Sequence, residues 1–450
     1  MTLRFGTDGV RGPAAELTDE LVAALGQAAA TVLGTGRFVV ARDPRQSGAR
    51  LEAALVGGLV AAGASPAVMG IVPTPALAWV CADGGWPGAM ISASHNPFGD
   101  NGVKFFAAGG LKLADEVETR LEHELDRVLA QAAGSASGSI GGLHDPVDAG
   151  SDLAHYERAV VESVAGRRLD GLRVVIDCAN GAASVVAPRV LARLGADVRV
   201  IHADPDGLNI NDGCGSTHPE DLQAAVIESG SSVGLAFDGD ADRVLAVDEH
   251  GALIDGDHLI ALCALDLRGR GLLTDDAVVV TVMTNLGFRL AMAERGIEVI
   301  ETQVGDRYVL EALSARDLAL GGEQSGHVIF RRLATTGDGV LTGVQLLDML
   351  VRSGRPLSQL AGEAMTRLPQ VLVNVRVARR DPAMLAAIAD DIAAVEAELG
   401  DHGRVLVRAS GTEPLVRVMV EATDESVARA MADRLVRALG TATETEARPA

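Results

Sequence analysis

Runs of β-branched residues alternate with stretches rich in alanine and leucine along most of the chain, and one arrangement of the two recurs three times. An apolar run ends in a polar turn, an alanine- and leucine-rich segment follows, and a glycine then leads into a second apolar run. Short apolar runs bounded by turn residues predict strands, and the longer segments between them predict helices. Each copy therefore predicts a strand, a helix and a second strand parallel to the first. The three copies occupy residues 38–69, 172–201 and 277–300.

The last part of the chain follows a different pattern. An alternating strand at 371–377 precedes a long helix at 383–399, two strands around a glycine turn and a final helix, which is typical of an α+β domain. Residues 132–142 consist almost entirely of Gly, Ser and Ala and predict a linker. The predicted fold class is α/β, with three related domains of parallel or mixed sheet and a C-terminal α+β domain. The predicted domains are residues 1–150, 151–252, 253–368 and 369–450.

The composition agrees with layered α/β domains. Of the 450 residues 48% are hydrophobic but only 3% are aromatic, so the core is built from Ala, Val, Leu and Ile. The apolar stretch Ala53–Ala82 is divided by Pro66, Pro73 and Pro75 into pieces shorter than the roughly 20 residues that cross a bilayer. A formal net charge of -22 excludes general attraction to nucleic acid or to an anionic membrane. An anionic small substrate would need a local basic pocket.

The cysteines and the first residues indicate a compartment. Cys81, Cys178, Cys214 and Cys263 stand singly, without the Cys-x-x-Cys spacing of zinc or redox sites, and predict reduced thiols that serve in packing. The N-terminal residues lack the basic and then apolar order of a signal peptide. These features predict a cytoplasmic location.

One polar loop offers a hydroxyl for covalent chemistry. Residues 92–97 read Ser-Ala-Ser-His-Asn-Pro, between a predicted strand at Gly88–Ile91 and a turn rich in Gly, Asp and Asn. Ser94 is therefore expected to project from the end of a strand into a cleft, where it can carry a phosphoryl group. The alternative is that Ser92 and Ser94 only cap a turn.

Three aspartates, Asp238, Asp240 and Asp242, directly follow a predicted buried strand at 232–237. Alternate residues of an extended segment lie on one side, so the three carboxylates face one point. They repel one another unless a cation lies among them, and an all-oxygen set suits a hard ion such as Mg²⁺. The spacing also matches part of an EF-hand loop. That alternative fails because Arg243 stands where the loop needs glycine, and strands flank it where helices are required.

Two further loops carry polar groups. Residues 321–327 (Gly-Gly-Glu-Gln-Ser-Gly-His) offer groups that bind sugar hydroxyls or an amine, with a plain turn as the alternative. Residues 408–414 (Arg-Ala-Ser-Gly-Thr-Glu-Pro), with Arg417 on the next strand, offer hydroxyls, N–H groups and two guanidiniums that suit a phosphate dianion. The chain has no Gly-x-x-x-x-Gly-Lys-Ser/Thr loop and no kinase signature, so ATP is not indicated as the phosphate source.

Only Lys104 and Lys112 among the 39 basic residues are lysines. Lysine can give up its proton whereas arginine cannot, so Lys104, just past the turn at 99–101, is a candidate for acid/base work. An ordinary surface lysine is the alternative. Near the N-terminus, Arg11 stands beside flexible glycines and could orient a phosphorylated Ser94.

Five segments, in this order, resemble the α-D-phosphohexomutase superfamily: FGTDGVRG at 5–12, SASHNP at 92–97, DGDADR at 238–243, GGEQSGH at 321–327 and RASGTEP at 408–414. The resemblance covers the whole chain. The opening segment, residues 96–106 and Gln324 are most similar to the bacterial branch that acts on amino sugars. The chain has Ala409 where the superfamily often has proline, at a position whose side chain need not touch phosphate.

The resemblance implies four domains around a central cleft, with the last domain closing over the phosphate that the substrate already carries. Ser94 would be the phosphoserine, and one of its phosphate oxygens would complete the shell of one Mg²⁺ held by Asp238, Asp240 and Asp242. The other implied roles are sugar binding by Glu323 and Ser325, distal phosphate binding by Arg408, Ser410, Gly411, Thr412 and Arg417, general acid/base catalysis by Lys104 or His327, and support of the transferred phosphoryl group by Arg11, His95 and Arg243.

The implied reaction interconverts glucosamine 6-phosphate and glucosamine 1-phosphate through a bisphosphorylated sugar, and would feed UDP-N-acetylglucosamine and peptidoglycan synthesis. A hexosamine or hexose 1,6-bisphosphate would prime it. Phosphomannomutase or phosphoglucomutase activity is the alternative with the same chemistry. A phosphatase and a sugar-phosphate-binding regulator without turnover are alternatives of other classes. The expected partner is a small sugar phosphate, neither nucleic acid nor membrane, and a homodimer is left open.

Overall fold

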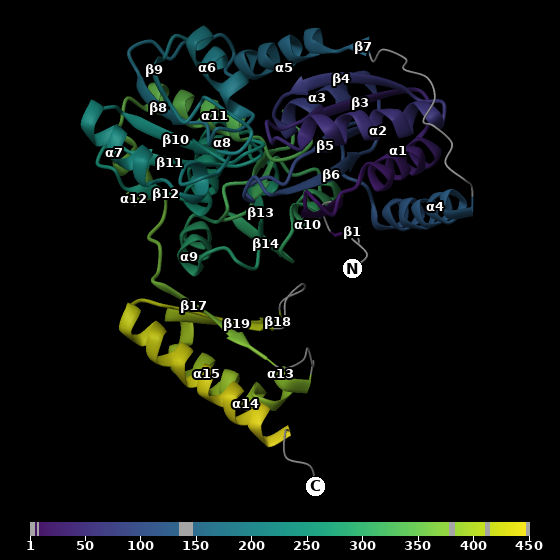
Figure 1. Ribbon diagram of the computed structural model, residues 1–450. Helices are drawn as coiled ribbons and strands as arrows, with labels where there is room; N and C mark the ends of the chain where they lie inside the picture. The colour runs from purple at the N-terminus through teal and green to yellow at the C-terminus, as the bar shows by residue number, and fades with distance from the viewer. Residues whose placement is uncertain (1–4, 7–8, 135–146, 378–382, 410–414, 447–450) are drawn as a thin grey trace. The chain divides into compact units, whose positions relative to one another are not determined.

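The computed structural model describes residues 5–6, 9–134, 147–377, 383–409 and 415–446 (Figure 1). The predicted linker lies mostly outside these residues. The chain divides into two compact units, which consist of Met1–Met283 with Ile297–Ala364 and of Thr284–Gly296 with Met365–Ala450. Three of the four described sheets belong to the first unit and the fourth belongs to the second.

The first sheet lies in the N-terminal part of the first unit. Its strands and their helices are β1 (Phe5–Gly6), β2 (Gly9–Pro13), α1 (Asp19–Leu33), β3 (Arg37–Arg42), α2 (Gly48–Ala61), β4 (Ser65–Ile71), α3 (Thr74–Gly84), β5 (Gly88–Ile91), β6 (Asp100–Phe106), α4 (Asp115–Gly134) and β7 (Val147–Asp148). The strand order is β1-β2-β6-β5-β3-β4-β7. Strands β5, β3, β4 and β7 run parallel, whereas β6, β2 and β1 pair antiparallel.

The second sheet has the order β12-β11-β10-β8-β9. Its elements are α5 (Gly150–Glu162), β8 (Arg173–Asp177), α6 (Ala183–Leu194), β9 (Asp197–Ile201), η1 (Gly215–Thr217), α7 (Glu220–Ser229), β10 (Val233–Phe237), β11 (Val244–Asp248) and β12 (Leu253–Ile254). Strand β12 pairs with β11, so this sheet reaches two residues past the predicted end of the second domain.

The third sheet has the order β14-β13-β15-β16. The elements in this part of the chain are α8 (Gly256–Gly269), η2 (Thr274–Asp276), β13 (Ala277–Thr281), α9 (Leu286–Glu294), β14 (Glu298–Thr302), α10 (Asp306–Ala315), β15 (Leu320–Gly322), β16 (Val328–Phe330), α11 (Gly339–Ser353) and α12 (Leu357–Ala364).

The three predicted strand-helix-strand units are confirmed. The pairs β3/β4, β8/β9 and β13/β14 are parallel, and each encloses a helix. The sheets are mixed, as the predicted fold class allows, because β5/β6, β10/β11 and β15/β16 are antiparallel. A parallel crossover needs a dozen or more residues, and the connections between these strands are shorter. These short connections are the loops 92–99, 238–243 and 323–327, so each related domain presents its motif at the same point of its sheet.

The C-terminal unit contains a three-stranded antiparallel sheet of order β17-β19-β18. Its elements are β17 (Gln370–Arg376), α13 (Ala383–Ala387), α14 (Ala389–Leu399), η3 (Gly400–His402), β18 (Gly403–Ala409), β19 (Leu415–Ala422) and α15 (Glu425–Glu446). The α+β prediction is confirmed, but the single helix expected at 383–399 is two helices. Ile388, with φ -111° and ψ 12°, leaves the helical region between them.

Helix α9 groups with this C-terminal unit, which its place in the third repeat does not predict. The reason is the buried carboxylate of Glu421 on β19. It accepts the backbone N–H of Leu286 at 3.0 Å and the side-chain amide of Asn285 at 3.2 Å, at the start of α9. Arg404 balances the charge, with its Nε 3.1 Å from the same carboxylate. A carboxylate is favoured there because the helix N-terminus carries partial positive charge.

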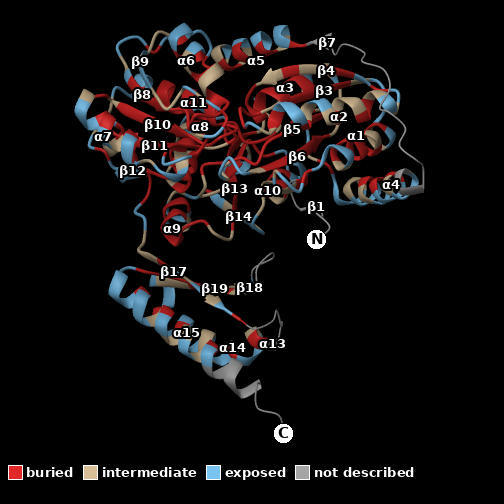
Figure 2. Cartoon of the chain, in the orientation of Figure 1, coloured by how far each residue is buried: buried red, intermediate tan, exposed pale blue. Residues whose placement is uncertain are grey.

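Burial follows the sheets and the helix faces that cover them (Figure 2). In the first domain one hydrophobic cluster joins β3 to α1, α2 and α4. The four cysteines are free and buried, in agreement with their predicted packing role. Among the described helices none is long and apolar enough to cross a membrane.

Helices α1 and α2 meet at two glycines. A Cβ at Gly58 would lie 1.9 Å from the carbonyl oxygen of Ala23, and a Cβ at Gly26 would lie 2.4 Å from that of Leu55. Real side chains cannot approach backbone so closely, so these glycines set the distance between the two helices.

Gly58→Ala is expected to destabilise the protein by about 1–3 kcal/mol through overpacking. The clash with backbone outweighs the roughly 1 kcal/mol that alanine gains over glycine inside a helix. The measurement is the midpoint of urea unfolding. Gly36→Ala is the matched control, because a Cβ at Gly36 meets no atom within 4 Å. Equal midpoints for both variants would contradict the close-contact argument.

Candidate active site

The aspartates of the loop after β10 converge as predicted. Asp238, Asp240 and Asp242 are buried, and each offers a carboxylate oxygen within 4.8 Å of the others. The loop turns at Ala241, whose φ is 57°, and leads directly into the antiparallel strand β11. Strands on both sides exclude the EF-hand alternative, as the sequence indicated.

The electrostatics of this aspartate cluster favour a bound cation. Burial, with the charges of Asp242 and Asp240, raises the pKa of Asp238 well above its usual value. Among the described residues, Asp240 Oδ1 and Asp242 Oδ1 are buried without a hydrogen-bond partner. Buried carboxylate oxygens without partners are costly. An oxygen-only donor set with free ligand atoms fits a hard divalent cation.

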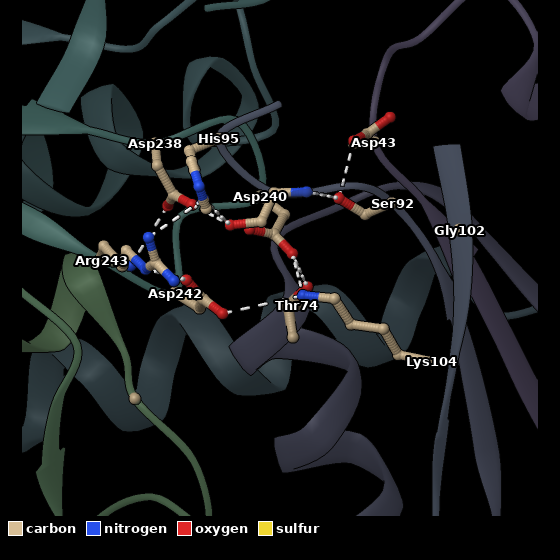
Figure 3. A network of polar contacts seen from close by, with 12 residues as sticks. Asp43, Thr74, Ser92, His95, Gly102, Lys104, Asp238, Asp240, Asp242 and Arg243 are labelled. Atoms are coloured by element: carbon tan, nitrogen blue, oxygen red, sulfur yellow. Dashed lines mark hydrogen bonds and ion pairs between the residues drawn. The ribbon is translucent and has the colours of Figure 1, made fainter. Parts of the chain in front are cut away.

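Groups from the first domain reach the same cluster (Figure 3). Thr74, at the start of α3, donates its hydroxyl to Asp240 Oδ2 at 2.7 Å. Lys104 on β6 is almost fully buried, with Nζ 2.9 Å from Asp240 Oδ2 and 3.8 Å from Asp242 Oδ2. Lys104 is therefore not a surface lysine.

Ser94 lies against the cluster, in the loop between β5 and β6. Its side chain is buried, and its Oγ donates a hydrogen bond to Asp238 Oδ2 at 2.5 Å. The backbone of Ser94 has a φ of 51°, a left-handed conformation that costs a residue other than glycine roughly 1–3 kcal/mol. Such strain persists only where the surroundings fix the backbone.

A buried arginine holds the backbone of the Ser94 loop in place. The Arg45 side chain is fully buried and donates to the Ser94 carbonyl at 2.8 Å and the Asn96 carbonyl at 2.7 Å. Its Nε also lies 2.9 Å from Asp43 Oδ2. Asn211, from the second domain, donates to the same two carbonyls at 2.9 and 3.0 Å. Arg45 and Asn211 thus hold the Ser94 loop from two sides.

Ser92 completes the support of this loop. Its hydroxyl donates to Asp43 Oδ2 at 2.7 Å and accepts the backbone N–H of Ser94 at 2.9 Å. Sequence reasoning missed Asp43, Arg45 and Asn211. The available indication was the position of Asp43 and Arg45 just past the carboxyl end of the parallel strand β3, where α/β sheets place functional groups.

A histidine lies beside Ser94, and the charges of two arginines act on that histidine. His95 Nδ1 is 3.4 Å from Ser94 Oγ and accepts a hydrogen bond from Arg243 Nη1 at 3.0 Å. Burial, with the charges of Arg243 and Arg11, lowers the pKa of His95 to about 4. His95 is therefore neutral near pH 7 and acts there as a hydrogen-bonding group, not as an acid.

The loop between β15 and β16 places His327 near the aspartates. Its Nδ1 is 3.6 Å from Asp242 Oδ2, and its Nε2 accepts the N–H of Gly337 at 3.0 Å. The neutral ring therefore carries its proton on Nδ1, facing the carboxylate. Burial opposes protonation, but the hydrogen bond and charge of Asp242 raise the pKa of His327.

Glu323 and Ser325 of the same loop are partly exposed, and the Ser325 hydroxyl lies 3.4 Å from Glu323 Oε2. The second carboxylate oxygen, Oε1, accepts the backbone N–H of Gly305 at 3.1 Å. These contacts fix the orientation of the Glu323 carboxylate, and its partial exposure leaves it accessible to a polar ligand.

The predicted phosphate loop belongs to the C-terminal unit. Arg408 on β18 stands directly opposite Arg417 on β19. Burial, with the charge of Arg417, lowers the pKa of Arg408. Within the described part of the chain, Arg417 Nε is buried without a hydrogen-bond partner. Like charges opposite each other destabilise a sheet, and a bound anion removes that cost. Ser410, Gly411 and Thr412 lie outside the described residues.

Comparison with family models finds the four domains described as phosphoglucomutase/phosphomannomutase. The alpha/beta/alpha domains I, II and III match residues 2–131, 154–251 and 255–368, and the C-terminal domain matches residues 372–438.

Curated relatives match nearly the whole chain. The phosphoglucosamine mutase of Rhodococcus opacus is 54% identical over 441 residues, covering 96% of this chain and 98% of that protein. The protein of the same name from Frankia casuarinae is 53% identical over 458 residues, covering 98% and 99%.

Solved structures share the fold. A phosphoglucomutase/phosphomannomutase family protein from Burkholderia thailandensis has a TM-score of 0.79 and 27% identity, covering 97% of each chain. Aspergillus fumigatus N-acetylphosphoglucosamine mutase, in complex with GlcNAc-6P and magnesium, has a TM-score of 0.70 and 20% identity over 98% of this chain and 96% of that one. At that identity the likeness shows the fold alone.

Asp240→Asn is expected to lower the affinity for divalent cations by more than about tenfold, because it removes a negative charge and weakens one oxygen ligand. Electron paramagnetic resonance of bound Mn²⁺ measures the affinity. Asp401→Asn, the same change at an exposed carboxylate, is the control. Unchanged Mn²⁺ affinity in Asp240→Asn would contradict a cation site at the aspartate cluster.

Proposed function

The chain belongs to the phosphoglucomutase/phosphomannomutase family, and we propose that it is an isomerase that interconverts glucosamine 6-phosphate and glucosamine 1-phosphate. The relatives that share about half of its residues over nearly the full length carry the name of this activity. The contact of Ser94 Oγ with Asp238 is the observation on which the mechanism rests. It supports a nucleophilic hydroxyl at a cation-binding cluster, as phosphoryl transfer requires.

The reaction has two phosphoryl transfers. In the first, O1 of glucosamine 6-phosphate attacks the phosphorus on Ser94 and its proton passes to a base, while the bond from Ser94 Oγ to phosphorus breaks and Oγ takes up a proton. The sugar bisphosphate then turns around. In the second, Ser94 Oγ attacks the phosphorus on O6 and gives its proton to a base, while the bond from O6 to phosphorus breaks and O6 takes up a proton. The product is glucosamine 1-phosphate and the phosphoserine is restored.

The chain's residues divide this work. Lys104 and His327 flank the aspartate cluster and are the candidates for proton transfer. The transferred phosphoryl group is supported by Arg11, His95 and Arg243. Because His95 is neutral near pH 7, it contributes as a hydrogen-bond donor or acceptor. The burial of Ser94 excludes water that would otherwise hydrolyse the phosphoserine.

Substrate binding uses the remaining groups. Glu323 and Ser325 bind sugar hydroxyls, because the Ser325 hydroxyl lies next to the Glu323 carboxylate and both residues are partly exposed. Arg408 and Arg417 bind the phosphate that is not reacting, together with Ser410, Gly411 and Thr412. The adjacent guanidiniums suit a dianion.

Mg²⁺ is the proposed cation, one per active site, held by Asp238, Asp240 and Asp242 and by a phosphoserine oxygen. When bound it neutralises charge that develops on the transferred phosphoryl group. A hexosamine or hexose 1,6-bisphosphate primes Ser94. The product feeds UDP-N-acetylglucosamine and peptidoglycan synthesis. The cytoplasmic location and the homodimer stay predictions.

Ser94→Ala is expected to reduce turnover by at least about 10⁴-fold, because it removes the hydroxyl that is proposed to carry the phosphoryl group. Circular dichroism and thermal unfolding should match the wild type. Ser151→Ala, at an exposed serine on α5, is the control. Retention of normal turnover in Ser94→Ala would rule out the phosphoserine.

The substrate is tested by phosphorus NMR of the wild-type protein with Mg²⁺ and a trace of hexose 1,6-bisphosphate. Separate samples contain the 6-phosphates of glucosamine, glucose and mannose. A 1-phosphate should form fastest from glucosamine 6-phosphate. Preference for mannose or glucose would keep the mechanism and contradict the substrate. Release of inorganic phosphate alone would indicate a phosphatase, and no reaction would favour a binding regulator.

A further inference from the structure

Both lysines of the chain belong to one run of charged side chains, although 37 of the 39 basic residues are arginines. Lys104 pairs with Asp240 and lies 3.8 Å from Asp242. His327 lies between Asp242 at 3.6 Å and Asp306 at 3.5 Å. Lys112 forms an ion pair with Asp306 at the far end. Because almost all other basic residues are arginines, the presence of both lysines in one network suggests that Lys112 has a specific role.

Lys112 occupies a restricted position. It follows β6, is bridged to Phe106, and its side chain is only 8% exposed. Its partner Asp306 is the first residue of α10 in the third domain. A buried ion pair that loses one partner leaves an uncompensated charge, which costs more than the pair contributes when intact. The pair therefore constrains the start of α10.

The next residue strengthens this attachment. Arg307 is 5% exposed and forms ion pairs with Asp115 and with Glu118, the latter at 2.5 Å, both on α4. Two consecutive residues at the start of α10 are thus tied to the segment of the first domain that follows β6.

The start of α10 in turn orients the proposed sugar-binding carboxylate. The backbone N–H of Gly305 donates to Glu323 Oε1 at 3.1 Å. The backbone N–H of Glu323 donates to the carbonyl of His327 at 2.9 Å. A shift of Gly305 would therefore move the carboxylate that is proposed to hold the sugar.

We propose that Lys112 is a positioning residue for the sugar. Through Asp306 it fixes the start of α10, so that Gly305 presents Glu323 to the substrate. Lys112 touches neither substrate nor reacting atoms in this role. The inference rests on the proposed function in one respect, that Glu323 binds the sugar.

The kinetic test uses Lys112→Met with the sugar 6-phosphate that the wild-type protein turns over fastest. KM should rise about tenfold, the size expected for one lost hydrogen bond to a charged group, while kcat changes by less than about threefold. That split follows because the lost interaction holds substrate and transition state alike. A fall in kcat with unchanged KM would overturn the proposal, and so would wild-type values for both.

Two variants test whether Lys112 acts through Asp306. Asp306→Asn should raise KM by a similar factor, whatever it does to kcat through its contact with His327, and the double variant should raise KM no further, because both changes break the pair of Lys112 and Asp306. Multiplied effects in the double variant would contradict this coupling. Lys112→Arg keeps the charge and should keep KM within about threefold. If Lys112→Met does not fold, Lys112→Arg is the variant to measure in its place.

Arg316→Met is the matched control, because it removes a cation at the other end of α10, where Arg316 pairs with Glu298 and its side chain is 41% exposed. Its KM and kcat should equal those of the wild type. A tenfold rise in its KM would show that any loss of charge on α10 has this effect, and would overturn the specific role of Lys112.

Hydrogen exchange separates this proposal from the proposed function. Exchange of the Gly305 and Glu323 amides should be faster in Lys112→Met than in the wild type or in Arg316→Met, whatever the protein catalyses. Unchanged exchange at both amides would overturn the positioning role. Absence of turnover in the wild type would contradict the proposed function and leave the exchange result to decide the role of Lys112.

Discussion

Repulsion among three buried carboxylates is the constraint around which the first unit is organised. Asp238, Asp240 and Asp242 are close enough to share one cation, in a region where water cannot screen them. Neighbouring residues stabilise these carboxylates through ion pairs and hydrogen bonds. Lys104 and Thr74 approach from the first domain, and His327 approaches from the third. The cluster therefore draws groups from three domains to one point, and this favours a single arrangement of the three sheets.

The same constraint explains the unusual backbone of Ser94. Its hydroxyl must reach Asp238, and the loop does so by placing Ser94 in a left-handed conformation. The cost is offset by hydrogen bonds to the Ser94 carbonyl from Arg45 and Asn211, which come from two different domains. The conformation of Ser94 thus depends on how the first two domains pack, and not on its own loop alone. Strain of this kind belongs to sites where geometry has to be fixed before the reaction.

Local sequence patterns predicted the parts of the structure that local physics decides. The three strand-helix-strand units followed from apolar periodicity, and the convergence of the aspartates followed from alternate spacing after a strand. The antiparallel return strands could have been inferred from the short loops, since a parallel crossover needs more residues. The support by Asn211 and Glu421 could not be predicted, because each acts on a segment far away in the sequence. The roles of Ser410 and Thr412 in the loop at 408–414 stay predictions, because both residues lie outside the described part of the chain.

The charge of the chain also bears on how it binds an anionic substrate. With a net charge of -22 the protein repels phosphates at long range, but salt screens that repulsion beyond roughly 10 Å. Binding must then come from local cations that have no better partner. Arg408 and Arg417 are the proposed cations: among the described residues Arg417 Nε lacks a hydrogen-bond partner, the two arginines face each other across β18 and β19, and burial disfavours the charge of Arg408. A phosphate dianion placed between them would replace repulsion by two attractions. An acidic protein can therefore select a sugar phosphate by holding a few cations in an unfavourable arrangement until the anion arrives.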